Sequence, residues 1–190
     1  MERVYITDKT FEHIQYAKEP FVKGDYDGCH FRSCDLSNSD LSHCTFIDCT
    51  FTDCNLSLAK IVQTSFRDIV FTNCKLTGLH FDYCNTGLFS AAFENCNLTL
   101  SCFFQMKLKK INFTGSTLHE TDFTEADLSE ANLGNCDLFK AVFDHTILEK
   151  TDFRNAVNFS IDPATNKIKK AKFNKENLSG LLGNYDLDIS

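Results

Sequence analysis

Residues 29–58 read CHFRS CDLSN SDLSH CTFID CTFTD CNLSL when they are divided into groups of five. In every group a cysteine or serine is followed two positions later by leucine or phenylalanine, which we call the centre of the pentad. A period of five fits neither an α-helix nor a flat sheet, which repeat every ~3.6 and ~2 residues. It fits a short strand followed by a corner, in which the small residue and the centre point inward and the other residues face outward.

The pentads extend through most of the chain. Centres recur every five residues from Phe21 to Phe81 and again from Leu88 to Asn158. Leucine, phenylalanine, isoleucine or tyrosine occupies 27 of these 28 centres, and Asn158 is the exception. Aspartate or asparagine often precedes the centre, where its side chain can bond nearby backbone and favour a turn. Residues of this kind are Asp35, Asp40, Asn55, Asn97, Asp122 and Asp127.

Centres that lie four pentads apart are of the same type, which predicts that four pentads close one coil. One column contains Leu36, Leu56 and Leu76, and its neighbour contains Phe31, Phe51 and Phe71. Each column shifts by two residues once, and in a third column this shift places Leu88 above Phe66. We therefore expect a two-residue insertion near 82–90, as a bulge or small loop. The pattern predicts a four-sided parallel β-helix of about seven coils, with an interior filled by side chains.

Residues 21–158 resemble the pentapeptide-repeat proteins, whose motif is A(D/N)LXX. The resemblance implies an all-β fold, a right-handed quadrilateral parallel β-helix. We predict an N-terminal cap over residues 1–20, the repeat region over 21–158, and a C-terminal cap with a short helix over 159–190.

The C-terminal tail departs from the repeat. Asn174 can cap a short helix from Lys175 to Leu182 that ends at Gly183, and alternating apolar residues after it are typical of an edge strand. Such a tail can cover the last coil of a solenoid, join two copies, or do both. It resembles the tail of the Qnr, MfpA and McbG branch, where C-terminal ends pair two rods. The predicted homodimer interface consists of Leu178, Leu181, Leu182, Tyr185, Leu187 and Ile189.

The ten cysteines are predicted to be structural thiols in a reducing, cytoplasmic environment, because the N-terminus lacks an apolar signal-peptide segment. Eight occupy the small inward position, and Cys84 keeps the same register. Cys102 lies outside that register and could be a reactive thiol. CxxC, HExxH, phosphate-loop and nucleophile-elbow motifs do not occur, so we expect no metal site, no cofactor and no catalytic residue.

Charge is the remaining indicator of function. The net charge of −7 disfavours nucleic acid and anionic membranes as ligands, and the chain has no apolar run long enough to span a bilayer. Residues 120–152 have the same net charge of −7 as the whole chain. Some of these acids face lysines on the adjacent coil and could form a neutralised ladder. The candidate partner-binding acids are Glu120, Glu125, Glu130, Asp144 and Glu149.

Two functions remain open at this point. The resemblance to the Qnr-like branch implies a non-catalytic rod that mimics duplex DNA, binds DNA gyrase or topoisomerase IV, and protects the enzyme from quinolones or toxins. The long inserted loops of typical Qnr rods are absent here. The alternative is a generic pentapeptide-repeat scaffold with an unidentified protein partner, since the repeat encodes a fold rather than a function.

Overall fold

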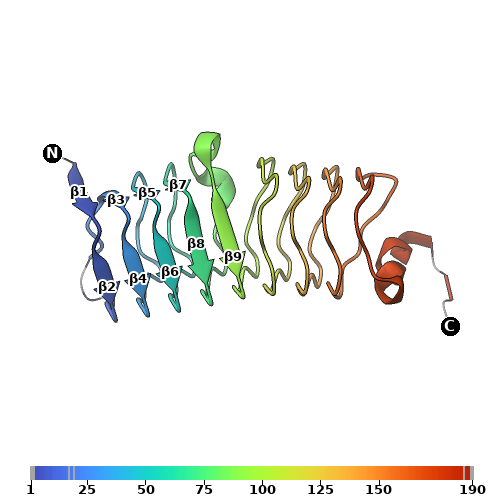
Figure 1. Cartoon of the computed structure of the whole chain (residues 1–190), viewed down its shortest axis with the longest axis horizontal. Helices are drawn as coiled ribbons and strands as arrows, with labels where there is room; N and C mark the ends of the chain where they lie inside the picture. Colours follow the sequence, from blue (N-terminus) through green and yellow to red (C-terminus); the bar gives the residue numbers. More distant parts are fainter. Residues whose placement is uncertain (1–2, 17, 19, 186, 189–190) are drawn as a thin grey trace.

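The protein is a rod of stacked coils, here described from a computed structural model that covers residues 3–16, 18, 20–185 and 187–188 (Figure 1). Two parallel sheets line the N-terminal half. The first has the strand order β1-β3-β5-β7 and the second β2-β4-β6-β8-β9. The first sheet consists of Val4–Thr7, Gly24–Asp27, Thr45–Ile47 and Ser65–Arg67. The second consists of Thr10–Glu12, His30–Arg32, Thr50–Thr52, Ile69–Thr72 and Ala91–Glu94.

Strand register confirms that four pentads make one coil. Phe31 pairs with Phe51, the centre that follows four pentads later, and Phe51 pairs with Phe71 in the same way. The next step pairs Phe71 with Phe93 and is longer by two positions, so the insertion falls between them. The fold is therefore the right-handed quadrilateral parallel β-helix that the pattern and the resemblance predicted.

The coil has four faces, which we letter in chain order. Two of them consist of single parallel bridges along the whole rod, and the two that carry the sheets continue as single bridges beyond Glu94. Face A carries the bridged residues Gln15, Asp35, Asn55, Lys75, Asn97, Thr117, Asp137 and Val157. Face B carries Asp40, Lys60, His80, Cys102, Asp122 and Val142. Face C is the first sheet followed by Lys107, Asp127, Ile147 and Lys167. Face D is the second sheet followed by Asn112, Asn132, Asp152 and Lys172.

Face A has eight bridged positions, so the coil count differs slightly from the predicted seven. The difference arises at the N-terminus. The strands β1 and β2 precede the first predicted pentad, and they pair with β3 and β4. These strands form the first rung of the stack. The assignment of residues 1–20 to a cap stays a prediction.

Stacked aromatic rings fill the interior of the N-terminal half. The rings of Phe31 and Phe51 have centroids 4.6 Å apart and planes only 4° apart, and Phe71 and Phe93 continue the column at 5.0 and 5.3 Å. All four side chains are fully buried. Offset stacked rings attract each other beyond their burial, so the column both fills the coil and keeps successive coils in register.

The turn role of the aspartates and asparagines that precede a centre is confirmed at positions such as 35 and 127. Asp35 Oδ1 accepts a hydrogen bond from the backbone N–H of Ser37 at 3.0 Å, and Asp127 Oδ1 accepts one from Ser129 at 2.9 Å. The corner itself follows two residues after the centre, where the backbone has a positive φ, as at Glu125 (57°). An acidic or amide side chain before the centre thus satisfies an N–H group that the corner leaves unpaired.

The insertion forms two 3₁₀ turns, η1 (Phe81–Tyr83) and η2 (Thr86–Leu88), which protrude from the rod (Figure 1, green). The prediction that Leu88 is an inward centre was wrong, because Leu88 is 62% exposed. Phe89 packs inward instead, with its ring 6.4 Å from that of Phe66 and 5.9 Å from that of Phe81. The extra residues shift the inward position by one, from Leu88 to Phe89. Only the packed structure shows which of these two side chains points inward.

The tail folds over the last coil through η3 (Lys175–Leu181) and η4 (Gly183–Tyr185). The short helix is a 3₁₀ helix, and the predicted Asn174 cap was wrong in its side-chain contact. Asn174 Oδ1 accepts a hydrogen bond from the backbone N–H of Asn155 at 2.7 Å instead of capping η3. Phe159 rather than Asn158 is buried at the end of the centre column.

The residues after η3 differ from the predicted edge strand. Tyr185 ends η4 and Leu187 belongs to no regular element, while Ile189 lies outside the described residues. Across the part of the chain that the structure covers, no helix has the length and apolarity needed to cross a membrane.

Candidate functional site

The five candidate acids do not share one face, because a spacing of one pentad moves a side chain to the next corner of the coil. Glu120, Glu125 and Glu130 occupy three successive corners, each with a positive φ. Glu120 and Glu125 border face B on its two sides, and Asp144 lies on face B one coil further on. Glu130 and Glu149 belong to face C.

Face C is electrically mixed. Glu130 Oε1 lies 3.6 Å from Lys109 Nζ and 3.8 Å from Lys150 Nζ, so two lysines offset its charge. Lys107 and Lys110 lie beside this pair on the same face and its corner. The ladder of alternating charges expected from the sequence is therefore present around Glu130, and Glu130 is poorly suited to attract a cationic partner.

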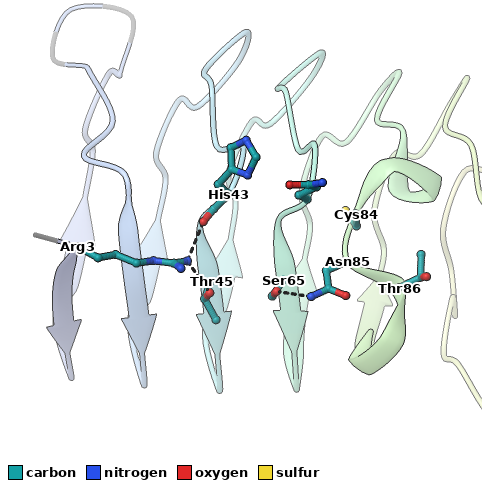
Figure 2. A pocket seen from close by; sticks show the side chains of 8 residues that line it. Arg3, His43, Thr45, Ser65, Cys84, Asn85 and Thr86 are labelled. Atoms are coloured by element: carbon teal, nitrogen blue, oxygen red, sulfur yellow. Dashed lines mark hydrogen bonds between the residues drawn. The ribbon is translucent and has the colours of Figure 1, made fainter. Parts of the chain in front are cut away.

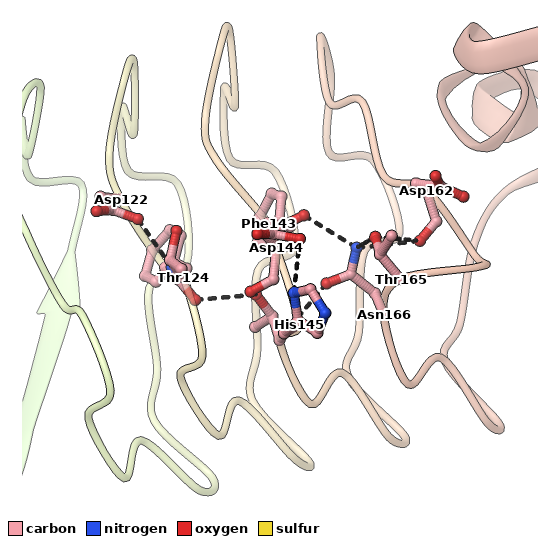
Figure 3. A network of polar contacts seen from close by, with 10 residues as sticks. Asp122, Thr124, Phe143, Asp144, His145, Asp162, Thr165 and Asn166 are labelled. Carbon is pink, nitrogen blue, oxygen red and sulfur yellow. Dashed lines mark hydrogen bonds and ion pairs between the residues drawn. The ribbon is translucent and has the colours of Figure 1, made fainter.

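Face B is acidic over its C-terminal coils. Asp122, Asp144 and Asp162 follow one another on successive coils (Figure 3). Asp122 Oδ1 accepts the N–H of Thr124 at 2.8 Å, and His145 Nδ1 lies 2.8 Å from Asp144 Oδ1. Lys140 occupies the corner between faces A and B.

Among the described residues, no acid of face B lies within ion-pair distance of Lys140. Its Nζ lies 5.2 Å from the ring centroid of Phe139, a face A residue, in a cation–π contact. Glu125 Oε2 accepts a neutral hydrogen bond from Gln105 Nε2 at 2.8 Å and keeps its charge unpaired by any described lysine or arginine. Asp152, an acid of residues 120–152 on face D, is closely paired, since its Oδ2 lies 2.6 Å from Arg154 Nη2.

The predicted dimer residues divide into two groups. Leu181 is partly buried and packs against the protein's own core, and Leu182 is likewise half-buried. Leu178, Tyr185 and Leu187 are 41%, 55% and 57% exposed. The first group holds the tail on its own rod, and the second is free to contact another molecule.

Amide side chains of the tail satisfy the backbone of the last coil. Asn177 Nδ2 donates to the carbonyl oxygens of Phe153 at 3.2 Å and Ala156 at 3.0 Å. Gly180 packs so closely on Phe159 that an added Cβ would collide with the ring. The tail thus covers carbonyl groups that the next coil would otherwise bind, as the open end of a solenoid requires.

The cysteines behave as structural residues. All ten are free thiols, and nine are buried. Desolvation raises the pKa of Cys49 and of Cys136 to about 12. Burial is also the largest cause that raises the pKa of Cys102, to about 11. A thiol with a raised pKa is a poor nucleophile at neutral pH, so Cys102 is not an activated thiolate.

A groove of 560 Å³ opens between β5, β7 and η2 (Figure 2). Arg3 crosses it, and its Nη2 donates to the carbonyl oxygen of His43 at 2.7 Å and to Thr45 Oγ1 at 2.9 Å. Asn85 Nδ2 donates to Ser65 Oγ at 3.3 Å on the other side. Its described lining contains no paired nucleophile and base, so the groove indicates no catalytic chemistry.

Sequence reasoning missed one cluster. The ligand atoms of His80, Asp82 and Cys102 all lie within 4.8 Å of one another on face B. The available signal was the spacing between stacked positions, which increases by two residues at the insertion and places Cys102 beside His80. Asp82 carried no signal, since its position depends on how η1 folds.

Residues 25–88 match the pentapeptide repeat region family, and residues 96–135 and 107–144 match the family of pentapeptide repeats in eight copies. The chain belongs to the pentapeptide-repeat family. This pentapeptide-repeat protein has no match among curated protein sequences.

Solved structures of other pentapeptide-repeat proteins are similar to it at low identity. One is QnrB1, a plasmid-mediated fluoroquinolone resistance protein, with 19% identity over 99% of this chain and 98% of QnrB1 and a TM-score of 0.45. Another is HetL from the cyanobacterium Nostoc, which is involved in the regulation of heterocyst differentiation, with 17% identity over 89% of this chain and 82% of HetL and a TM-score of 0.43.

Proposed function

We propose that this pentapeptide-repeat protein is a non-catalytic DNA mimic that binds a type II topoisomerase, DNA gyrase or topoisomerase IV, through face B. The supporting observation is the acidic run on that face. Glu120, Asp122, Glu125 and Asp144 belong to it or border it, and Lys140 at its edge lies against Phe139. Modulation of the enzyme and protection from quinolones or toxins are parts of the same proposal.

Charge density makes the mimicry physically reasonable. Neighbouring coils are about 4.8 Å apart, and duplex DNA presents about three phosphates in that length. Face B presents one to three carboxylates per coil over residues 120–145. A cationic groove built for phosphates is attracted to such a surface, and the attraction weakens with salt because exposed charges are screened.

A pair of matched double variants separates face B from face C. Glu125→Gln with Asp144→Asn removes two charges from face B, and Glu130→Gln with Glu149→Gln removes two from face C. Each change keeps the size of the side chain. The measurement is supercoiling by gyrase at increasing protein concentration, with and without a fluoroquinolone, at two salt concentrations.

The face B variant is expected to need at least ten times more protein than the wild type for the same effect on gyrase, and the face C variant less than twice as much. Equal losses in both variants would contradict face B as the contact. No effect of the wild type at stoichiometric excess, with gyrase and with topoisomerase IV, would favour the interaction scaffold. Circular dichroism of each variant controls for folding.

We also propose that two rods pair through the tail into a homodimer. Leu178, Tyr185 and Leu187 support this because they leave apolar area exposed beside the last coil. Leu178→Asp is expected to convert the dimer to a monomer in sedimentation, because burial of an unpaired carboxylate is costly. Leu100→Asp, at an exposed leucine far from the tail, is the control and should leave the mass unchanged. A monomeric wild type at micromolar concentration would contradict the dimer.

A further inference from the structure

Three chemically different side chains meet where the insertion leaves the repeat. His80 Nδ1 lies 3.3 Å from Asp82 Oδ1, and the ligand atoms of both lie within 4.8 Å of Cys102 Sγ. Asp122 follows on the next coil, with its Oδ2 3.9 Å from Cys102 Sγ. Cys102 is the one cysteine of the chain that is not fully buried.

The fold brings these residues together in a defined way. His80 and Cys102 occupy bridged positions on adjacent coils of face B, and Cys102 is bridged in turn to Asp122. The turn η1 then returns Asp82 toward Cys102, because the N–H groups of Phe81 and Asp82 both donate to the Cys102 carbonyl oxygen, at 3.0 and 3.4 Å.

The histidine ring is oriented before any ligand arrives. It stacks on Tyr83, with centroids 4.8 Å apart and planes 12° apart. This contact turns Nδ1 toward Asp82 and limits the rotation of the ring. Asp82 is also confined, since its side chain is only 14% exposed, while the His80 side chain is 52% exposed and leaves a path from solvent.

We propose that His80, Asp82 and Cys102 bind a divalent transition-metal ion of the zinc type, with Asp122 within reach as a fourth ligand. Imidazole nitrogen, thiolate sulfur and carboxylate oxygen are the three donor types that Zn²⁺ accepts in a tetrahedral site. Two ligands about 2.0–2.1 Å from a tetrahedral ion are about 3.3 Å apart. The His80–Asp82 separation of 3.3 Å already matches this edge.

Charge and softness favour this class of ion over others. Calcium and magnesium prefer all-oxygen sites, whereas a thiolate with an imidazole selects zinc and similar metals. A bound dication would offset the negative charges of Asp82 and Asp122, and the Cys102 thiol would release its proton when it ligates the ion. It would also tie η1 to the two coils that follow, in a region where two extra residues interrupt the regular hydrogen bonding.

Cobalt(II) is the probe, because its visible and near-ultraviolet absorption reports coordination number and thiolate ligation. The wild type is expected to bind one equivalent of Co²⁺ with a thiolate charge-transfer band, and added Zn²⁺ should displace it. Cys102→Ala should lose that band and weaken Zn²⁺ binding at least tenfold in calorimetry. Asp82→Asn should weaken binding without removing the band.

His145→Ala is the matched control. His145 also lies beside an aspartate on face B, at 2.8 Å from Asp144, but has no thiol partner. Its metal binding should equal that of the wild type. Thermal unfolding adds a second readout, in which Zn²⁺ raises the melting temperature of the wild type and not of Cys102→Ala. Absence of saturable binding, or an unchanged cobalt spectrum in Cys102→Ala, would overturn the proposal.

Discussion

The N-terminal and C-terminal halves of the rod solve the same packing problem with different chemistry. Before the insertion, two faces form strands of three or four residues, stacked phenylalanines dominate, and cysteine takes the small inward position. After the insertion one strand, β9, remains; beyond it all four faces are single bridges, and alanine, serine and threonine usually replace cysteine.

The inward donor is the clearest point of contrast. Cys49 Sγ donates to the carbonyl oxygen of Tyr26 on the preceding coil at 3.5 Å. Thr151 Oγ1 donates to that of Leu128, at the same sequence separation, at 2.7 Å. A hydroxyl is a stronger donor than a thiol, so the same position supplies mainly apolar packing in one half and a buried hydrogen bond in the other. The pentad therefore demands a small residue there and leaves its chemistry open.

Truncation of a stacked ring is expected to have the largest effect. Phe51→Ala should lower the free energy of unfolding by about 3–5 kcal/mol, because it leaves a cavity and removes three ring contacts, with Phe31, Phe46 and Phe71. Leu128→Ala in the other half should cost less, within about 2–5 kcal/mol. Urea unfolding measured by circular dichroism checks both. A larger loss for Leu128→Ala would contradict the view that the aromatic column holds the coils together.

The inward hydroxyl comes next. Thr151→Val keeps the shape of the side chain but removes the donor to Leu128, so we expect a loss of about 1–2 kcal/mol in the same assay. Thr151→Cys, which gives this coil the donor of the N-terminal half, should lose less. If neither variant loses stability, the hydroxyl donor contributes nothing and the position selects for size alone.

Corner strain predicts a smaller, stabilising effect. Leu100 adopts a positive φ of 61° and is 55% exposed, so it has backbone strain and little packing to lose. Asparagine tolerates this conformation, and Leu100→Asn should stabilise the protein by about 0.5–1 kcal/mol. Thermal unfolding measures the gain. A fall in melting temperature would mean that the leucine has a contact worth more than the strain.

Removal of an exposed ion pair is expected to have the smallest effect on the free energy of unfolding. Lys23 lowers the pKa of Asp40 to about 2 from its ordinary value of 3.8. Because the folded pKa is depressed, this stabilisation is present above pH 4 and is lost as the pH falls toward 2. Asp40→Asn should therefore cost a few tenths of a kcal/mol at pH 7, since exposed pairs contribute ~0–1 kcal/mol. Most of the cost should be gone at pH 2, where about half of the Asp40 carboxyl groups are protonated in the folded protein, and a pH-independent difference would contradict the ion-pair account.

Much of the fold was predictable because the repeat is local. The inward direction of Leu36, Phe51 and their columns follows from strand alternation, and the turn role of Asp35 follows from its place before a centre. The prediction that Leu88 points inward was wrong, because the insertion contains no repeat that could set its register. The acids were identified correctly as charged surface groups, but their grouping by proximity in sequence placed Glu125 with Glu130, which lie on different corners.

The sequence by itself determined the period, the coil of four pentads, the identity of the core columns and the site of the insertion. These properties depend on side chains a few residues apart, or on a constant spacing, and therefore appear in one dimension. Only the tertiary structure decided that Phe89 turns inward, that Lys140 leaves face B for Phe139, and that η1 brings Asp82 to His80 and Cys102. Such outcomes depend on contacts between coils at an irregular point, where no spacing rule specifies the direction of a side chain.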